Sequence, residues 1–379
     1  MGKTKRRKHG EGSVYKRKDG RYSGFITLED HTRKYFYGGT EQEVVKKIRV
    51  ALHELEQGTL ATGPQQTVKQ FLEYWLEDVQ KTRVRTVTYE NNRFVIDNHL
   101  LPALGHIRLQ KLTVQHVQAM YVKKLNEGLS PGTIRNIHKV LHTALGYAKR
   151  IKLVGMNVSD EVELPRNKQH EVQVLTPEQA QVFLQKIQEH KLEALTTLAL
   201  TTGLRRGEIL GLCWQDIDLE KGSLHVRRTL VYLVSHGFIE GEPKTEMSKR
   251  KIVLPHFVIE VLKRHRTLQL EARLKAGTAW VDRDLVFPNT YGDFLLPQTL
   301  YKQFARLLKD LGLPHMRFHD LRHSTATLLL SMGVPMKVVQ ELLGHSNFST
   351  TANVYSHVLP SMQQEAMDKM DALFRQHSQ

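Results

Sequence analysis

The spacing of apolar and aromatic residues changes along this chain, and the change restricts the folds that it can adopt. Segments 13–17, 22–28 and 34–37 are rich in β-branched and aromatic residues, and an Asp-Gly turn pair separates the first two. Such segments predict three short antiparallel strands. Beyond Thr40 the pattern changes to helical spacing, so a small sheet precedes a largely helical remainder.

Signals for helix starts recur along that remainder. Residues 40–43 form a capping-box pattern that predicts a helix to about Gln57, and residues 67–70 repeat this pattern. Ser130-Pro131 precedes an apolar stripe at helical spacing, made of Ile134, Ile137, Leu141, Leu145 and Ala148. Residues 176–179 predict a further N-cap, with a proline at the first helical position.

The chain has 379 residues, too many for one ordinary core, since domains usually hold roughly 100 to 200 residues. We expect a multidomain α+β protein. Its predicted parts are a three-stranded sheet with one helix, an all-helical domain, and a mainly helical domain with a small antiparallel sheet, at residues 1–60, 66–163 and 171–379.

The connections follow from composition. Residues 58–66 and 164–170 are polar or rich in turn residues and are predicted to join the domains. In the third domain, segments 224–234 and 251–255 predict strands with a turn-rich segment between them, and residues beyond Pro297 return to helical spacing.

The charge balance favours a polyanionic partner. Lys and Arg number 55 against 39 Asp and Glu, a formal charge of +16. DNA, RNA or an acidic membrane face would all fit. Two groups of residues are candidates for contact with double-stranded DNA. They are Lys16, Arg17, Lys18, Arg21 and Tyr22 in the sheet module, and Arg135, His138 and Lys139 on the polar face of the 130–148 helix. Solvated surface is the alternative for both groups.

Cysteine usage and hydropathy indicate the compartment. Cys213 is the single cysteine, so no internal disulfide and no thiolate metal cluster is expected. We find no run of about 18 to 20 apolar residues and no apolar signal core at the start. The expectation is a soluble, intracellular protein in a reducing compartment, not associated with a membrane.

Four segments near the C-terminus carry residues suited to phosphate chemistry. Arg205 follows a glycine between two predicted helices, and Lys244 lies in a basic hairpin. His319 and Arg322 lie one turn apart at a predicted helix start, where an anion is favoured. A Gly-His pair that contains His345 precedes Tyr355. Each residue alone has an ordinary explanation, as a capping, surface or packing residue.

A zinc site is a competing interpretation of the histidines. His319 and His323 are four residues apart and could join His345 or His357. The metalloprotease motif needs a Glu after the first His, whereas Asp320 follows here, and an arginine would repel Zn²⁺. We therefore expect neither a metal nor another cofactor.

As a set, these segments resemble the tyrosine recombinases of the phage integrase kind. The resemblance rests on Thr202-Gly-Leu-Arg205, Pro243-Lys244-Thr, His319-Asp-Leu-Arg322-His and Leu343-Gly-His345 with Tyr355, in that order. It extends through regions similar to the arm-binding module and the core-binding (SAM-like) domain of integrases from temperate phages and conjugative transposons. It covers nearly the whole chain and implies a protein of the bacterial cytoplasm, associated with the nucleoid.

The resemblance implies a role for each residue. Tyr355 would attack a DNA phosphate and form a 3′-phosphotyrosine, and Arg205 and Arg322 would hold the phosphate oxygens. Lys244 would protonate the leaving 5′-oxygen, His319 would exchange a proton near Tyr355, and His345 would bind the phosphate or orient its neighbours. Glu208 would support His319 or Arg205. Neither Mg²⁺ nor ATP is implied.

The resemblance also implies partners. Four protomers would act on core and arm-type attachment sites and pass through a Holliday junction, with an excisionase or a host DNA-bending protein as further partners. An apolar stripe after Pro360 would fold back on its own domain or, as in relatives, dock into a neighbouring subunit. The alternatives are a type IB topoisomerase and a catalytically silent DNA-binding accessory protein.

Overall fold

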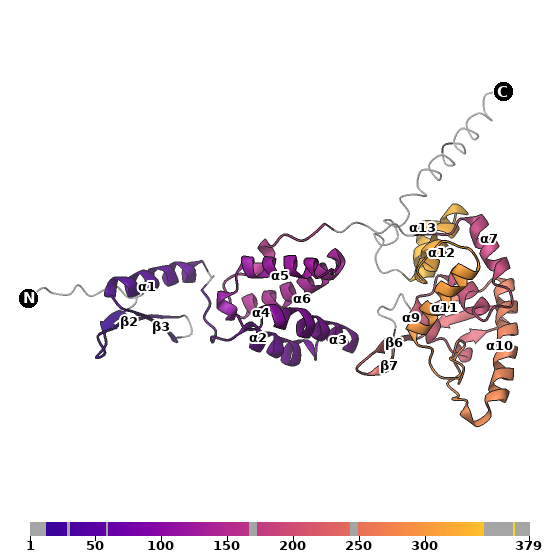
Figure 1. Cartoon of the computed structure of the whole chain (residues 1–379), viewed down its shortest axis with the longest axis horizontal. Helices are drawn as coiled ribbons and strands as arrows, with labels where there is room; N and C mark the ends of the chain where they lie inside the picture. The colour runs from indigo at the N-terminus through magenta and orange to yellow at the C-terminus, as the bar shows by residue number, and fades with distance from the viewer. Residues whose placement is uncertain are drawn as a thin grey trace, which may run out of the picture. The chain divides into compact units, whose positions relative to one another are not determined.

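The computed structural model describes residues 13–28, 31–57, 60–166, 173–242, 249–344 and Met367 (Figure 1). The chain divides into two compact units, residues 1–169 and 170–379. The first unit contains two separate apolar clusters, one in the N-terminal sheet module and one among the helices that follow. The predicted domain boundaries at residues 60–66 stay predictions.

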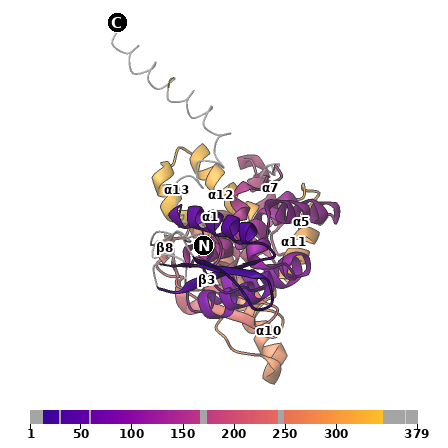
Figure 2. The same ribbon diagram turned by 90° about the vertical axis from the view of Figure 1, so that its left-hand side faces the viewer.

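The N-terminal module is the predicted sheet with one helix. Strands β1 (Ser13–Lys16), β2 (Tyr22–Thr27) and β3 (Arg33–Gly38) pair antiparallel in that order. Figures 1 and 2 show α1 (Glu41–Glu56) along one face of this sheet. The apolar residues between them are Ile26, Val44, Ile48, Ala51 and Leu60.

The start of α1 differs in one detail from the expected capping box. The Thr40 side chain accepts from the Glu43 amide at 3.2 Å, as predicted. The Glu43 carboxylate, however, accepts from the amide of Gly39 at 3.0 Å rather than from that of Thr40. The reciprocal bond has moved one residue upstream, while the helix start is as predicted.

The rest of the first unit is helical. Its elements are α2 (Val68–Tyr74), a π-helical turn (Trp75–Gln80), α3 (Thr86–Val95), a second π-helical turn (Ile96–Leu100), α4 (Leu101–Leu104), a 3₁₀ turn (Leu109–Lys111), α5 (Val114–Asn126), α6 (Pro131–Arg150) and a 3₁₀ turn (Val158–Glu161). Thr67 and Gln70 form the predicted capping box. The predicted stripe of α6 is buried in the core of this region.

The second unit is mainly helical. Its helices are α7 (Pro177–Lys186), α8 (Glu193–Thr202), α9 (Arg206–Leu210), α10 (His256–Ala276), α11 (Pro297–Asp310), α12 (Asp320–Ser331) and α13 (Met336–Leu343). Strands β4 (Ile217–Asp218), β5 (Ser223–Val226) and β8 (Arg250–Val253) form one antiparallel sheet, and β6 (Thr229–Leu233) and β7 (Gly237–Gly241) form a hairpin.

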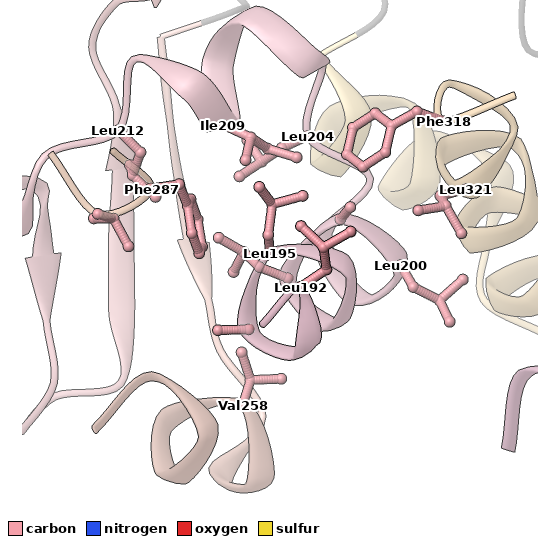
Figure 3. Packing of buried hydrophobic residues seen from close by; sticks show 14 of the residues in the cluster. Leu192, Leu195, Leu200, Leu204, Ile209, Leu212, Val258, Phe287, Phe318 and Leu321 are labelled. Carbon is pink, nitrogen blue, oxygen red and sulfur yellow. The ribbon is translucent and has the colours of Figure 1, made fainter. Parts of the chain in front are cut away.

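Helix α8 lies at the centre of this unit. Eight of its residues are buried, and they cover nearly its whole circumference, as expected of a helix enclosed by other elements. Figure 3 shows Leu195 and Leu200 of α8 among apolar side chains from α9, α10, α12 and the connecting segments. A smaller cluster between α12 and α13 contains Ala326, Leu330, Val339 and Leu343.

Two predictions about the strands were wrong. Segment 224–234 is not one strand, because β5 and β6 belong to different sheets and the chain turns at Arg227-Arg228. At this turn both arginines face the buried carboxylate of Asp216, at 3.6 and 3.4 Å. The segment predicted to be turn-rich contains strand β7. Among the helices of the described segments, none combines the length and the apolar character needed to cross a bilayer.

Candidate active site

Arg205 is positioned by the junction between α8 and α9. Helix α8 ends at Thr202, and Gly203 adopts a left-handed conformation with φ of +62°. A Cβ at Gly203 would collide with the side chain of Leu343, so glycine suits both the backbone and the close approach of α13. Arg205 then lies directly before α9, with its side chain 37% exposed.

Glu208 lies next to Arg205 and is buried. Its carboxylate accepts from the Arg205 amide at 3.0 Å and from Arg205 Nη1 at 2.7 Å. Arg250 of β8 donates to it as well, with Nη2 3.0 Å from Oε2. Arg205 was one of the two partners expected for Glu208, whereas Arg250 was not anticipated. Burial raises the pKa of the Glu208 carboxyl, but Arg250 and Arg205 outweigh burial and hold the pKa below its usual value.

Arg322 is buried within the first turn of α12. Its Nη1 donates to the carbonyl of Gly203 at 2.6 Å and its Nη2 to the carbonyl of Leu343 at 2.8 Å. These bonds join α12 to the end of α8 and to the end of α13. The guanidinium group is thereby fixed between two chain segments that are distant in sequence.

His319 lies directly before α12, one turn from Arg322 as expected; part of His319 reaches solvent although its ring is largely desolvated by its neighbours, whereas Arg322 is buried. Withdrawal from water and the neighbouring His323 and Arg322 lower the pKa of His319 to about 4. The rings of His319 and His323 are 5.2 Å apart. At neutral pH the His319 ring is therefore neutral and able to accept a proton.

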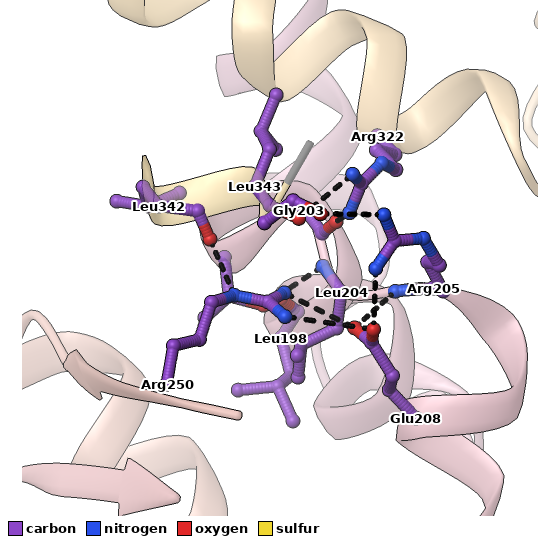
Figure 4. Close-up of polar contacts among 11 residues, drawn as sticks. Leu198, Gly203, Leu204, Arg205, Glu208, Arg250, Arg322, Leu342 and Leu343 are labelled. Atoms are coloured by element: carbon purple, nitrogen blue, oxygen red, sulfur yellow. Dashed lines mark hydrogen bonds and ion pairs between the residues drawn. The ribbon is translucent and has the colours of Figure 1, made fainter. Parts of the chain in front are cut away.

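The three arginines converge on the end of α13 (Figure 4). Arg250 Nε donates to the carbonyl of Leu342 at 2.7 Å, Arg322 Nη2 to that of Leu343 at 2.8 Å, and Arg205 Nη2 to that of Gly344 at 2.7 Å. The structure thus brings Arg205, Glu208 and Arg322 together. Lys244, His345 and Tyr355, and the C-terminal stripe after Pro360, lie outside the described residues.

Arg250 is the residue of this cluster that the sequence analysis missed. In the sequence, Arg250 belongs to the basic stretch 243–251 that also contains Lys244, and a solvated position is the simplest expectation for such a stretch. Its alternation with Ile252, and its register with Val226 of β5, place it on the inner face of the sheet. That alternation was the available signal.

The predicted DNA-binding residues of the N-terminal module fall on two sides of its sheet. Lys16, Arg17, Lys18 and Arg21 are exposed around the β1–β2 turn. Tyr22 instead packs toward α1 with the apolar core. Tyr15, Tyr35 and Tyr37 occupy the opposite, exposed face, where the Arg17 guanidinium is 5.6 Å from the centre of the Tyr37 ring. Tyr22 is therefore not part of the exposed aromatic face.

The predicted residues of α6 also differ among themselves. Arg135 is exposed and donates to the carbonyl of Pro165 at 2.9 Å, and Lys139 is exposed. His138 is half-buried, and its Nδ1 lies 3.1 Å from the hydroxyl of Tyr121. Desolvation and the neighbouring His142 lower the pKa of His138. His138 therefore joins two helices as well as bordering the basic flank.

The described residues contain no candidate metal site, because within them no three His, Cys, Asp or Glu side chains are grouped closely enough to hold a metal ion. His319 and His323 lie beside Asp320, but that carboxylate is committed to Arg317, whose Nη2 lies 2.9 Å away. His345 and His357, the other two candidate ligands, fall outside the described part of the chain.

Comparison with known proteins identifies the family. Residues 173–362 match the model of the phage integrase family, and residues 67–126 match the N-terminal SAM-like domain of phage integrases. A tyrosine recombinase XerC-like protein of Caldanaerobacter subterraneus is 32% identical over 90% of this chain and 92% of its own length. The ICEBs1 integrase of Bacillus subtilis is 28% identical over 75% of this chain and 77% of its own length.

Solved structures agree in fold. The Tn1549 transposon integrase in complex with transposon right end DNA matches 81% of this chain and 100% of its own, with a TM-score of 0.70 and 23% identity. A lambda integrase tetramer bound to a Holliday junction matches 92% of this chain and 96% of its own, with a TM-score of 0.57 and 18% identity. With the family models and the XerC-like relative, these matches show that the chain belongs to the phage integrase family and is a tyrosine recombinase.

Proposed function

We propose that this recombinase integrates a mobile element by cutting and rejoining DNA at specific sites through a covalent bond between Tyr355 and a 3′-phosphate. The observation that carries the proposal is the convergence of Arg205 and Arg322 on adjacent carbonyls of one helix end. Two guanidinium groups held this close are suited to the non-bridging oxygens of one phosphate.

The chemistry requires help for the nucleophile and for the leaving group. The pKa of a free tyrosine phenol is about 10, so the site must remove its proton at neutral pH. His319 is neutral at this pH and is proposed to exchange a proton near Tyr355, although its lowered pKa makes the ring a weak base in the absence of DNA. In the proposed scheme Lys244 protonates the departing 5′-oxygen, and His345 binds the phosphate or orients its neighbours.

Electrostatic stabilisation by the arginines would replace a metal ion. Negative charge grows on the phosphate oxygens as Tyr355 attacks, and preorganised donors oppose it without reorganisation. Loss of one such donor typically lowers the rate by about two to three orders of magnitude. The phosphotyrosine bond keeps the energy of the broken phosphodiester, so the scheme uses no ATP.

Exchange between two duplexes requires four active sites, which we propose are supplied by four copies of this chain. The lambda integrase tetramer on a Holliday junction is the structural precedent among the neighbours of this fold. The apolar stripe after Pro360 is proposed to dock into the adjacent protomer. The exposed tyrosines and basic residues of the N-terminal module are proposed to bind arm-type DNA, with an excisionase or a host bending protein as accessory factors.

The test is direct detection of the covalent intermediate. Wild-type protein is incubated in EDTA with a nicked suicide substrate that carries the core site, taken from the DNA flanking the gene. We expect a covalent protein–DNA complex on a denaturing gel, and none from Tyr355→Phe. A wild type without the complex, or a Tyr355→Phe variant with as much complex as wild type, would refute the mechanism.

A type IB topoisomerase would use similar chemistry on one duplex. The N-terminal sheet module argues for a recombinase, since its exposed aromatic and basic face offers a second DNA-binding surface. The two functions differ in product: a recombinase joins DNA from two attachment sites, whereas a topoisomerase only relaxes supercoils.

A further inference from the structure

Arg250 has no assigned part in the chemistry above, yet it occupies the centre of the arginine cluster. Its side chain is 8% exposed and makes contacts at both ends of the guanidinium group. The Nη atoms face the Glu208 carboxylate, at 3.0 and 3.5 Å, and Nε donates to the carbonyl of Leu342 at 2.7 Å. One planar group therefore joins α9 to the end of α13.

The end of α13 depends on such contacts. Leu343 belongs to the small apolar cluster between α12 and α13, which is separate from the main core of the unit. Three successive carbonyls, those of Leu342, Leu343 and Gly344, each accept from a different arginine. Positive groups at a helix C-terminus also interact favourably with the helix dipole. The arginines thus fix where α13 ends relative to α9 and α12.

The end of α13 leads directly into the segment that contains two of the proposed catalytic residues. Gly344 is followed at once by His345, and Tyr355 comes ten residues later. Glu208, which also accepts from Arg250, binds both the amide and the guanidinium group of Arg205. Arg250 therefore contacts Glu208, which orients the proposed phosphate-binding Arg205. It also contacts Leu342, at the end of the helix that precedes the segment with Tyr355.

We propose that Arg250 is a positioning residue for strand cleavage, which sets Arg205 and the start of the segment leading to His345 and Tyr355 in one fixed arrangement. This inference rests on the proposed function of those residues. Arg250 acts through Glu208 and through the carbonyl of Leu342, and it does not need to touch DNA. A displacement of about 1 Å at a reacting group can lower the rate on the order of 100-fold, so loss of Arg250 is expected to have an effect of that size.

The experiment compares Arg250→Met and Arg250→Lys with a matched control, Arg228→Met. Arg228 also pairs with a buried carboxylate in the same unit, since its Nη2 lies 3.4 Å from Asp216 and its Nη1 lies 3.1 Å from the sulfur of Cys213. Single-turnover formation of the covalent complex is measured at saturating suicide substrate, below the melting transition of every variant. Affinity for the same DNA is measured in parallel.

We expect Arg250→Met to form the complex about 100-fold more slowly than Arg228→Met, with DNA affinity within threefold of wild type. Lysine keeps the charge but lacks the planar group that binds Glu208 and Leu342 at the same time. Arg250→Lys should therefore regain the stability lost in Arg250→Met but form the complex at less than a tenth of the wild-type rate. Equal rates for Arg250→Met and Arg228→Met, or full recovery by Arg250→Lys, would overturn the proposal.

A second measurement does not depend on activity. Hydrogen exchange of the amides at residues 340–344 should be faster in Arg250→Met than in wild type and unchanged in Arg228→Met. Unchanged exchange in Arg250→Met would also overturn the proposal. If wild type forms no covalent complex, the proposed function fails, and the exchange experiment still decides whether Arg250 positions the end of α13.

Discussion

Replacing Glu208 with glutamine would keep the shape of the side chain and remove the negative charge that Arg205 and Arg250 share. The Glu208 side chain is 3% exposed and the Arg250 side chain 8%, so water cannot solvate the charge left on Arg250. Arg205 is 37% exposed and can turn toward solvent. The main cost therefore comes from the lost attraction between Glu208 and the buried Arg250, rather than from the more exposed Arg205.

Removing one partner of a buried ion pair costs about 3–5 kcal/mol. Because one of the two arginines can relax into water, we expect the lower end, about 3 kcal/mol. A domain of this size changes its melting temperature by about 2–4 °C per kcal/mol, so the catalytic unit should melt about 6–12 °C lower. Covalent-complex formation should also slow, because Arg205 loses the carboxylate that orients it.

The assay is calorimetry at pH 7, with Glu341→Gln as the control. Glu341 pairs with Lys337 at 3.6 Å on the exposed side of α13, and its loss should leave the transition nearly unchanged. The folded pKa of Glu208 lies below its unfolded value of 4.5, so the stabilisation is present above pH 4.5 and lost as the pH falls. A shift below about 2 °C at pH 7, or a difference that grows in acid, would refute the reasoning.

Three further predictions address other parts of the chain. The folded pKa of His319 is about 4 against 6.5 when unfolded, so the unfolded state binds a proton first and stability falls from pH 6.5 toward 4. His319→Gln should reduce that slope of melting temperature against pH, and an unchanged slope would contradict the assignment. Replacing Lys16, Arg17, Lys18 and Arg21 with alanine should lower the log–log salt slope of arm-site binding by up to about 3 to 4, with core-site binding unaffected; equal losses at both sites would count against the N-terminal assignment. Ser130→Ala removes the N-cap of α6 and should destabilise the first unit by about 1 kcal/mol in thermal unfolding; a neutral effect would mean that Pro131 alone defines the start.

Signals confined to a few neighbouring residues predicted the local structure well. The caps at Thr67, Ser130 and Thr176 begin helices where expected, because the side-chain oxygen and the amide that it binds are three residues apart. The apolar stripe of α6 and the three N-terminal strands follow from periodicity in the same way. The residue set around Arg205, His319 and Arg322 was also evident, since each lies in a short motif.

The sequence by itself determined which elements form and which residue types are available for phosphate chemistry. The tertiary structure decided their partners, because these depend on contacts between distant segments: Arg250 meets Glu208 across 42 positions, and Arg322 meets Gly203 across 119. A basic run does not show which of its members turns inward, and segment 224–234 does not show that the chain turns at Arg227-Arg228, where both side chains face the buried Asp216. Burial of a carboxylate is a property of the whole fold, and in this protein it determines where the arginines point.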